Sequence, residues 1–444
     1  MALLALLVAC GGASQPDPAG PPNVLLVYTD DQRFDSLSAA GNTVIDTPNL
    51  DRIAQEGALF ERAYVVSSRC CPGRATALTG LYPTRHGVWS NHPDVDFPGE
   101  HRTVADDFLE AGYRTAWIGK WHLPNPGAVP VRGFTRFVSY EGPGKHFDQV
   151  LTIDGVETPT TGFQADRLTD EALRFLDEGS GPFFLAVAYK NPHVPMTPAH
   201  RHHGRLDGTA IPPPASASDP DASLPAFYRG LRNNSRHQVE SFVETTRRYW
   251  ELCLSIDDNV GRLLDHLERA GSLDETVVVL TTDNGQLLGE HGLTQKGLSY
   301  EPSIRVPLTI RYPARIPART RSAGLALNVD LYPTLCDLAG LSAPAGVDGT
   351  SLAPLWSEED EPWRQDFLYM APSFGEGAVS ERSVVEAGWK YVRIRAEGQE
   401  EEVLFDLAAD PDERVDLARD PGHAEILARL RARMTLEQER LGDA

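Results

Sequence analysis

The sequence lacks several features that mark particular classes of protein. It carries 63 acidic residues against 41 basic ones, a net charge of −22, so no positive excess is available for nucleic acid or an anionic membrane surface. An anionic substrate would therefore need local positive charge at its site. The chain has only five cysteines and no Cys-x-x-Cys pair, which argues against both a disulfide-dependent fold and a zinc site. No internal repeat is evident.

The amino-terminal apolar stretch, residues 1–10, is too short to span a bilayer as a mature helix. Its end, Leu7-Val8-Ala9-Cys10, resembles a bacterial lipobox with Cys10 as the lipidated first residue, and the remainder of 1–22 resembles a flexible tether. The alternative is an ordinary cleaved signal peptide, and the basic segment expected of either is missing. We expect an exported protein, either periplasmic or anchored to the outer membrane of a bacterium through Cys10.

The length of 444 residues suffices for one large α/β domain and a smaller one. Apolar runs at 24–29, 183–189 and 276–282 predict buried strands, and they alternate with helical patterns such as 239–270. This alternation predicts a mostly parallel, helix-flanked sheet over residues 23–358. After residue 358, short strands linked by turns and a charged helix over 421–440 predict a C-terminal subdomain, residues 359–444, with a small antiparallel sheet.

Oxygen-bearing side chains follow two of the predicted strands directly. Asp30 and Asp31 end the first strand, and Asp283 and Asn284 follow the strand at 276–282. The carboxyl ends of strands carry the ligands in open α/β sheets. Adjacent carboxylates repel each other unless a hard cation screens them, so a cation site is one interpretation and a solvated acidic turn is the other.

The segment from Ser67 to Gly80 predicts a loop that runs into a helix. Pro72 suits the first helical position, and Gly73 permits a close approach by another part of the chain. A cysteine at a helix start lies where unpaired N–H groups favour negative charge, and Arg74 follows Cys70 by about one turn. The alternatives are a buried structural cysteine, a disulfide between Cys70 and Cys71, or half of a zinc site.

Two motifs give this segment a specific resemblance. Cys70-Cys71-Pro72-Gly73-Arg74, with Thr79-Gly80 behind it, resembles the Cys-x-Pro-x-Arg-x-x-x-x-Thr-Gly signature of the type I sulfatases. Gly112-Tyr113-x-Thr115-x-x-x-Gly119-Lys120-Trp121-His122 is similar to their second signature. The resemblance spans nearly the whole mature chain and implies an alkaline-phosphatase-like fold. It also implies that a formylglycine-generating enzyme oxidises Cys70, and not Cys71, to formylglycine, whose hydrate is the nucleophile.

The resemblance further implies the roles of individual residues. One Ca²⁺ would be bound by oxygen ligands and the modified cysteine, at Asp30, Asp31, Cys70, Asp283 and Asn284. Arg74 and His122 would orient and activate the hydrate. The sulfate group would contact Lys120, His193 and Lys296, with His193 or Lys296 near the leaving oxygen.

The implied substrate is a sulfate ester, on a sulfated carbohydrate. The chain carries Gly297 after Lys296 where many relatives carry arginine. Position 71 is a second cysteine, which is similar to several family members that act on N-acetylglucosamine 6-sulfate. One alternative is a formylglycine-dependent phosphonate monoester or phosphodiester hydrolase, although the contexts of His193 and Lys296 favour sulfate. Another is an exported lipoprotein that binds sulfated glycans without cleaving them.

Overall fold

The structure is a computed structural model. It describes residues 20–91, 97, 99, 101–124, 131–217, 224–229, 242–357, 362–371, 379–386, 388–396 and 398–443. Cys10 with its lipobox, and the predicted domain boundary at 358/359, lie outside the described residues. Within the described part, none of the helices combines the length and the apolarity needed to cross a bilayer.

The main sheet contains ten strands in the order β12-β2-β11-β8-β1-β7-β3-β4-β5-β6. Its centre is parallel, because β8, β1, β7, β3 and β4 all run in the same direction. Antiparallel pairs are formed by β11 with both neighbours and by β5 with β4 and β6. The strands are β1 (Asn23–Asp30), β2 (Ala58–Tyr64), β3 (Arg114–Gly119), β4 (Arg136–Ser139), β5 (Val150–Ile153), β6 (Val156–Pro159), β7 (Phe183–Pro192), β8 (Thr276–Thr282), β11 (Thr309–Arg311) and β12 (Thr320–Leu327).

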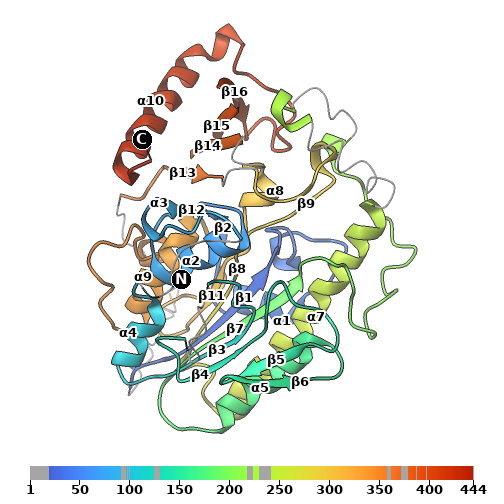
Figure 1. Cartoon of the computed structure of the whole chain (residues 1–444), viewed down its shortest axis with the longest axis vertical. Helices are drawn as coiled ribbons and strands as arrows, with labels where there is room; N and C mark the ends of the chain where they lie inside the picture. The colour runs from blue at the N-terminus through green and yellow to red at the C-terminus, as the bar shows by residue number, and fades with distance from the viewer. Residues whose placement is uncertain are drawn as a thin grey trace, which may run out of the picture.

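Helices cover both faces of this sheet (Figure 1). The alternation of side chains along β1 shows why its apolar run is continuous: Leu26 faces one hydrophobic cluster and Leu25 faces the other. The first cluster includes side chains of α2 (Cys70–Thr79), α4 (Val104–Glu110) and α9 (Leu331–Leu338). The second includes side chains of α1 (Pro48–Gln55), α5 (Gln164–Asp177) and α7 (Phe242–Arg269).

A second, four-stranded antiparallel sheet lies at the C-terminal end of the chain, with α10 (Ala424–Leu441) beside it (Figure 1). Its strands are β13 (Asp366–Met370), β14 (Val379–Glu386), β15 (Trp389–Ala396) and β16 (Gln399–Asp406). Tyr369 of β13 and Leu430 of α10 belong to the same hydrophobic cluster as Tyr64 of β2, so the two sheets share a core. The N–H of Met370 also donates to the carbonyl of Val66, 2.8 Å away.

Helix α2 begins at Cys70, two residues earlier than the sequence predicts, so Pro72 is its third residue. Proline is tolerated there because the first N–H groups of a helix have no intrahelical acceptor. A Cβ atom at Gly73 would lie 2.3 Å from the carbonyl oxygen of Asp283, so only glycine lets the first turn of α2 approach the end of β8 this closely.

The short helix α3 (Pro83–His86) is tied to α2 through a buried histidine. The Nδ1 atom of His86 accepts from the N–H of Val88 at 3.0 Å, and its Nε2 atom lies 3.1 Å from the hydroxyl of Thr76. Burial, with a smaller effect from His101, lowers the pKa of His86 to about 3. His86 is therefore neutral in the folded protein, because a protonated ring could not accept from Val88.

Candidate functional site

The site lies where four adjacent parallel strands end. Because β8, β1, β7 and β3 are neighbours in the sheet, the residues that follow them meet at one edge. These residues are Asp283 and Asn284 after β8, Asp30 and Asp31 at the end of β1, Lys190 and His193 at the end of β7, and Lys120 and His122 after β3.

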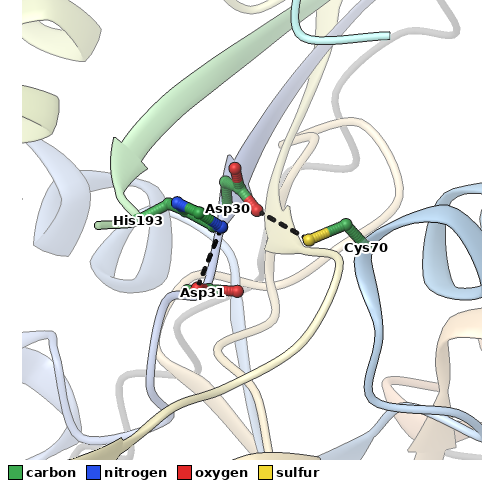
Figure 2. A group of neighbouring side chains, drawn as sticks. All are labelled: Asp30, Asp31, Cys70 and His193. Carbon is green, nitrogen blue, oxygen red and sulfur yellow. Dashed lines mark hydrogen bonds and ion pairs between the residues drawn. The ribbon is translucent and has the colours of Figure 1, made fainter. Parts of the chain in front are cut away.

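The start of α2 brings Cys70 to this edge, where it faces Asp30 (Figure 2). Its Sγ atom lies 3.4 Å from Oδ1 of Asp30 and 3.2 Å from Nζ of Lys296. Burial and Asp30 raise the pKa of the Cys70 thiol, but Lys120, Lys296 and His193 outweigh them and lower it to about 7. The surroundings therefore stabilise negative charge at position 70.

Each buried carboxylate at this edge has its own cationic partner. Lys120 contacts Asp30 and Lys296 contacts Asp31 through their ammonium groups. Arg74 donates from Nε and Nη2 to Oδ2 of Asp283, at 3.0 and 2.8 Å.

The two buried aspartates closest to Arg74 respond differently to their surroundings. Burial raises the pKa of Asp30, but Lys120, His193 and Arg74 together hold it well below its usual range. Burial and the neighbouring Asp30 raise the pKa of Asp283 well above its usual range. A further positive charge would help to keep all the carboxylates ionised.

The ring of His193 lies across this cluster, with Nε2 3.7 Å from Oδ2 of Asp31 (Figure 2). Lys190 supports it from behind, because its Nζ atom lies 3.2 Å from Nδ1 of His193 and donates to the carbonyl of Val194 at 2.7 Å. His146 contacts the carbonyl of His193 through Nε2, at 2.8 Å.

The sequence did not lead us to assign Lys190 a role in the site. A signal for Lys190 was present, since the chain has only five lysines and three of them, Lys120, Lys190 and Lys296, lie here. Such a small number makes a lysine at a strand end informative.

The two neighbouring cysteines have different environments. The thiol of Cys71 donates to the carbonyl of His122 at 2.6 Å, and its N–H donates to Oδ1 of Asn91 at 3.1 Å. Burial raises the pKa of Cys71 to about 12, so its thiol is neutral. Cys70 alone faces the carboxylates and ammonium groups.

His122 adjoins the site as a neutral ring. Burial and the positive charge of Lys120 lower its pKa to about 3, and its Nδ1 atom is buried without a hydrogen-bond partner among the described residues. Next to it is a surface depression of about 450 Å³, whose lining includes Asn91, Trp121, His122, Tyr140 and Glu141.

The donor set fits a hard divalent cation. Ligand atoms of Asp30, Asp31, Cys70 and His193 all lie within 4.8 Å of one another. The Oδ1 atom of Asn284 is buried and has no hydrogen-bond partner among the described residues, as a ligand oxygen would in the absence of its ion. One sulfur and one imidazole among several oxygens do not match the ligand sets of structural zinc sites.

Comparison with known proteins identifies the family of the chain. Residues 22–341 match the family described as Sulfatase, and residues 289–440 match the one described as N-sulphoglucosamine sulphohydrolase, C-terminal. An N-acetylglucosamine-6-O-sulfatase of Bacteroides thetaiotaomicron is 30% identical over 98% of this chain and 89% of its own length.

Two solved structures are also similar across nearly the whole chain. One, in complex with its substrate D-glucosamine-2-N,6-O-disulfate, superposes with a TM-score of 0.85 at 29% identity, over 95% of this chain and 98% of that one. A phosphonate monoester hydrolase of Agrobacterium radiobacter gives 0.80 at 25% identity, over 95% and 96% of the two chains. Both agree with the alkaline-phosphatase-like fold predicted from the sequence.

Proposed function

Since this chain belongs to the sulfatase family and is a sulfuric ester hydrolase, we propose that Cys70, oxidised to formylglycine, is its nucleophile and that a sulfated amino sugar of a glycan is its substrate. The observation that carries this proposal is the position of Cys70. Its Sγ atom lies between the carboxylate of Asp30 and the ammonium of Lys296, inside a buried ring of charged groups. Sγ stands in for the hydrate oxygens of the matured residue.

The oxidation of Cys70 requires a maturation partner. A formylglycine-generating enzyme would break the Cβ–Sγ bond, release the sulfur as sulfide and place oxygen on Cβ, with a two-electron oxidant such as dioxygen. The hydrate then supplies one hydroxyl for attack on sulfur and a second that allows the sulfate to leave as the aldehyde returns.

The cations of the site would hold the sulfate and its developing charge. Lys120 and Lys296 place ammonium groups beside position 70, and Arg74 fixes Asp283 behind it. Preorganised positive charge in a site that excludes water is the largest contribution to catalysis in many acyl- and group-transfer enzymes. Because the net charge of −22 repels an anion, this local cluster is what attracts the substrate.

A proton must reach the leaving alcohol as the S–O bond breaks. His193 is the best placed donor, since its ring is 15% exposed and faces the cluster, and Lys296 is the alternative. Lys190 and the carbonyl of Val194 both contact the Nδ1 side of the His193 ring, which leaves Nε2 directed toward the cluster. His122 would accept a hydrogen bond from the hydrate and orient it, because burial and Lys120 keep its ring neutral at physiological pH.

We propose Ca²⁺ as the cation, held by Asp30, Asp31, Asp283, Asn284 and the matured residue 70. The hard oxygen donors of this ligand set match Ca²⁺ better than a transition metal. When bound, the ion would lower the pKa of the hydrate and withdraw electrons from a sulfate oxygen.

The amino sugar is proposed from the relatives and from the surface beside the site. One relative described above is an N-acetylglucosamine-6-O-sulfatase, and one of the similar structures contains D-glucosamine-2-N,6-O-disulfate as its substrate. The depression next to His122 is lined by Asn91 and Glu141, whose polar atoms suit the hydroxyl and amide groups of such a sugar.

We also propose that the protein is exported and anchored through a lipid on Cys10. The Leu7-Val8-Ala9-Cys10 sequence supports this proposal. An exported, anchored enzyme would also have access to glycans outside the cell. Incorporation of labelled palmitate that is lost in Cys10→Ser would support the anchor, and a mature chain that begins elsewhere than Cys10 would refute it.

One experiment tests the hydrolase. Protein produced with a formylglycine-generating enzyme is assayed on an aryl sulfate, on N-acetylglucosamine 6-sulfate and on an aryl phosphodiester, with Cys70→Ala as the control. Turnover of both sulfates, with an 18-dalton loss of mass at position 70, is expected. Preference for the phosphodiester would favour the phosphonate monoester hydrolase alternative, and binding of the sulfated sugar without turnover by the matured protein would favour the non-catalytic lipoprotein.

A further inference from the structure

The loop that carries Lys296 lies against the C-terminal sheet. Leu298 and Tyr300, on either side of Ser299, are buried in one hydrophobic cluster with Val392 and Ile394 of β15 and Phe405 of β16. The apolar side chains of this loop therefore pack on the second sheet, while Lys296 reaches Asp31 and Cys70 at the edge of the first.

The backbone of Ser299 is held from both sides by buried side chains of that second sheet. Its N–H donates to Oε1 of Glu381 in β14, at 2.8 Å, and its carbonyl accepts from Nζ of Lys390 in β15, at 2.6 Å. Both side chains are completely buried. We call Glu381 and Lys390 together the Ser299 clamp.

The clamp is fixed by a wider set of buried contacts. Nζ of Lys390 also donates to Glu301 at 2.8 Å and to Glu413 at 2.7 Å, and the second carboxylate oxygen of Glu381 accepts from the hydroxyl of Tyr228. Burying such charges is costly, and apolar residues of similar volume would often be as stable. What the charged cluster adds over apolar packing is directional contacts to one backbone position.

A second contact reaches the same loop from β13. The N–H of Gly297 donates to the hydroxyl of Ser68, 3.1 Å away, and that hydroxyl lies 2.6 Å from the hydroxyl of Tyr369. Ser68 precedes Cys70 by two residues. These two hydrogen bonds therefore connect the segment that carries Cys70, the loop that carries Lys296 and the C-terminal sheet.

We infer that the C-terminal sheet positions Lys296 for sulfate binding, through the Ser299 clamp and the Tyr369–Ser68–Gly297 contact. Ser299 lies three residues from Lys296, a chain distance of at most about 11 Å, so fixing its two backbone groups limits where the ammonium can lie. Glu381, Lys390 and Tyr369 are then positioning residues for a reaction they do not touch. This inference rests on the proposed function, and it gives the second sheet a role in catalysis.

A double-mutant cycle tests the inference, because a residue that acts through Lys296 has nothing to act on once Lys296 is removed. Glu381→Ala is made in the wild-type and in the Lys296→Ala background. In the wild-type background we expect kcat/KM on an aryl sulfate to fall by about 10- to 100-fold, and affinity for inorganic sulfate to fall in parallel, as for loss of a charge-assisted hydrogen bond. In the Lys296→Ala background, the further loss should be below about threefold. Equal losses in the two backgrounds would overturn the inference.

Two other variants keep the test decisive. Glu381→Gln retains an acceptor oxygen for the N–H of Ser299, so it should restore most of the activity that Glu381→Ala loses. If Glu381→Ala does not fold, Tyr369→Phe carries the same cycle, because it removes one hydroxyl only. Its matched control is Tyr391→Phe in β15, whose hydroxyl donates to Glu402 instead and whose loss should leave the kinetics unchanged.

Titration of inorganic sulfate separates this inference from the proposed function. If the matured wild-type chain turns over no sulfate ester, the proposed hydrolysis is wrong. The affinities for inorganic sulfate of wild type, Glu381→Ala, Lys296→Ala and the double variant then still test whether the Ser299 clamp positions Lys296. If the wild-type chain turns over sulfate esters but the losses of kcat/KM in the cycle are additive, only the inferred role of the Ser299 clamp is overturned. No measurable sulfate binding by the wild-type chain would overturn it as well.

Discussion

The replacement Lys296→Ala tests the electrostatic account of the site most directly. The side chain is only 11% exposed, and its ammonium contacts Asp31 and lies 3.2 Å from Sγ of Cys70. Burial lowers the pKa of Lys296, but Asp31 and Cys70 outweigh burial, so the net shift is upward. The ammonium group is therefore charged at every physiological pH. If it also holds the sulfate, the variant loses one charge-assisted contact in a site that is largely shielded from water.

Such contacts contribute about 1.5–3 kcal/mol, which corresponds to about a 10- to 150-fold loss of kcat/KM at about 1.4 kcal/mol per decade. The neighbouring Gly297 carries no charge that could compensate. Lys296→Arg should rescue only part of the loss, because a planar guanidinium does not fit where a compact ammonium lies between Asp31 and Cys70.

The assay is steady-state hydrolysis of an aryl sulfate and of N-acetylglucosamine 6-sulfate by protein with equal formylglycine content. Lys145→Ala is the control, since Lys145 is an exposed lysine. Lys145→Ala should stay within about twofold of wild type, as surface substitutions usually do. Unchanged kinetics of Lys296→Ala on both substrates would remove this residue from the site and weaken the case for sulfate over phosphodiester.

Four further outcomes are expected. Cys70→Ala should abolish turnover, whereas Cys71→Ala, whose thiol only donates to a backbone carbonyl, should retain at least about a tenth of it; equal activity of Cys70→Ala and wild type would refute the assignment of the nucleophile. Exhaustive chelation should stop turnover and lower the melting temperature, because an ion present at 100 times its Kd stabilises the fold by about 2.7 kcal/mol; a fully active enzyme without metal by elemental analysis would contradict the cation site. Lys190→Met should lower kcat more than it raises KM, because it releases the ring of His193, and a change in KM alone would exclude this positioning role. The pKa of His86 is near 6.5 in the unfolded chain and near 3 in the folded one. Each pH unit below 6.5, down to about 3, therefore lowers the free energy of unfolding by about 1.4 kcal/mol. His86→Asn should show a shallower fall of melting temperature with decreasing pH, and the same dependence on pH as wild type would refute the neutral buried ring.

Much of the fold follows from local patterns in the sequence. The apolar runs at β1, β7 and β8 predict buried strands because each residue on either face meets a helical layer. The alternation of strands and helices predicts the parallel centre of the sheet, and the change of pattern after residue 358 predicts a second, antiparallel sheet. The antiparallel insertion of β11 between β2 and β8 does not follow from its three-residue strand, because pairing direction depends on contacts made far along the chain.

The sequence by itself predicted which residues would carry the chemistry. These are Cys70 at a helix start, the paired oxygens at the ends of β1 and β8, and Lys120 and His122 in a motif that resembles the second sulfatase signature. Only the tertiary structure decided how these groups are paired, that Cys71 faces a carbonyl while Cys70 faces charges, and that Lys190 supports His193. It alone shows that Glu381 and Lys390, about 90 residues beyond Lys296 in the chain, hold the loop on which that lysine lies. The physical reason is that composition and periodicity report on a residue's own segment, whereas the pairing of buried charges depends on which strand ends and loops the folded chain places side by side.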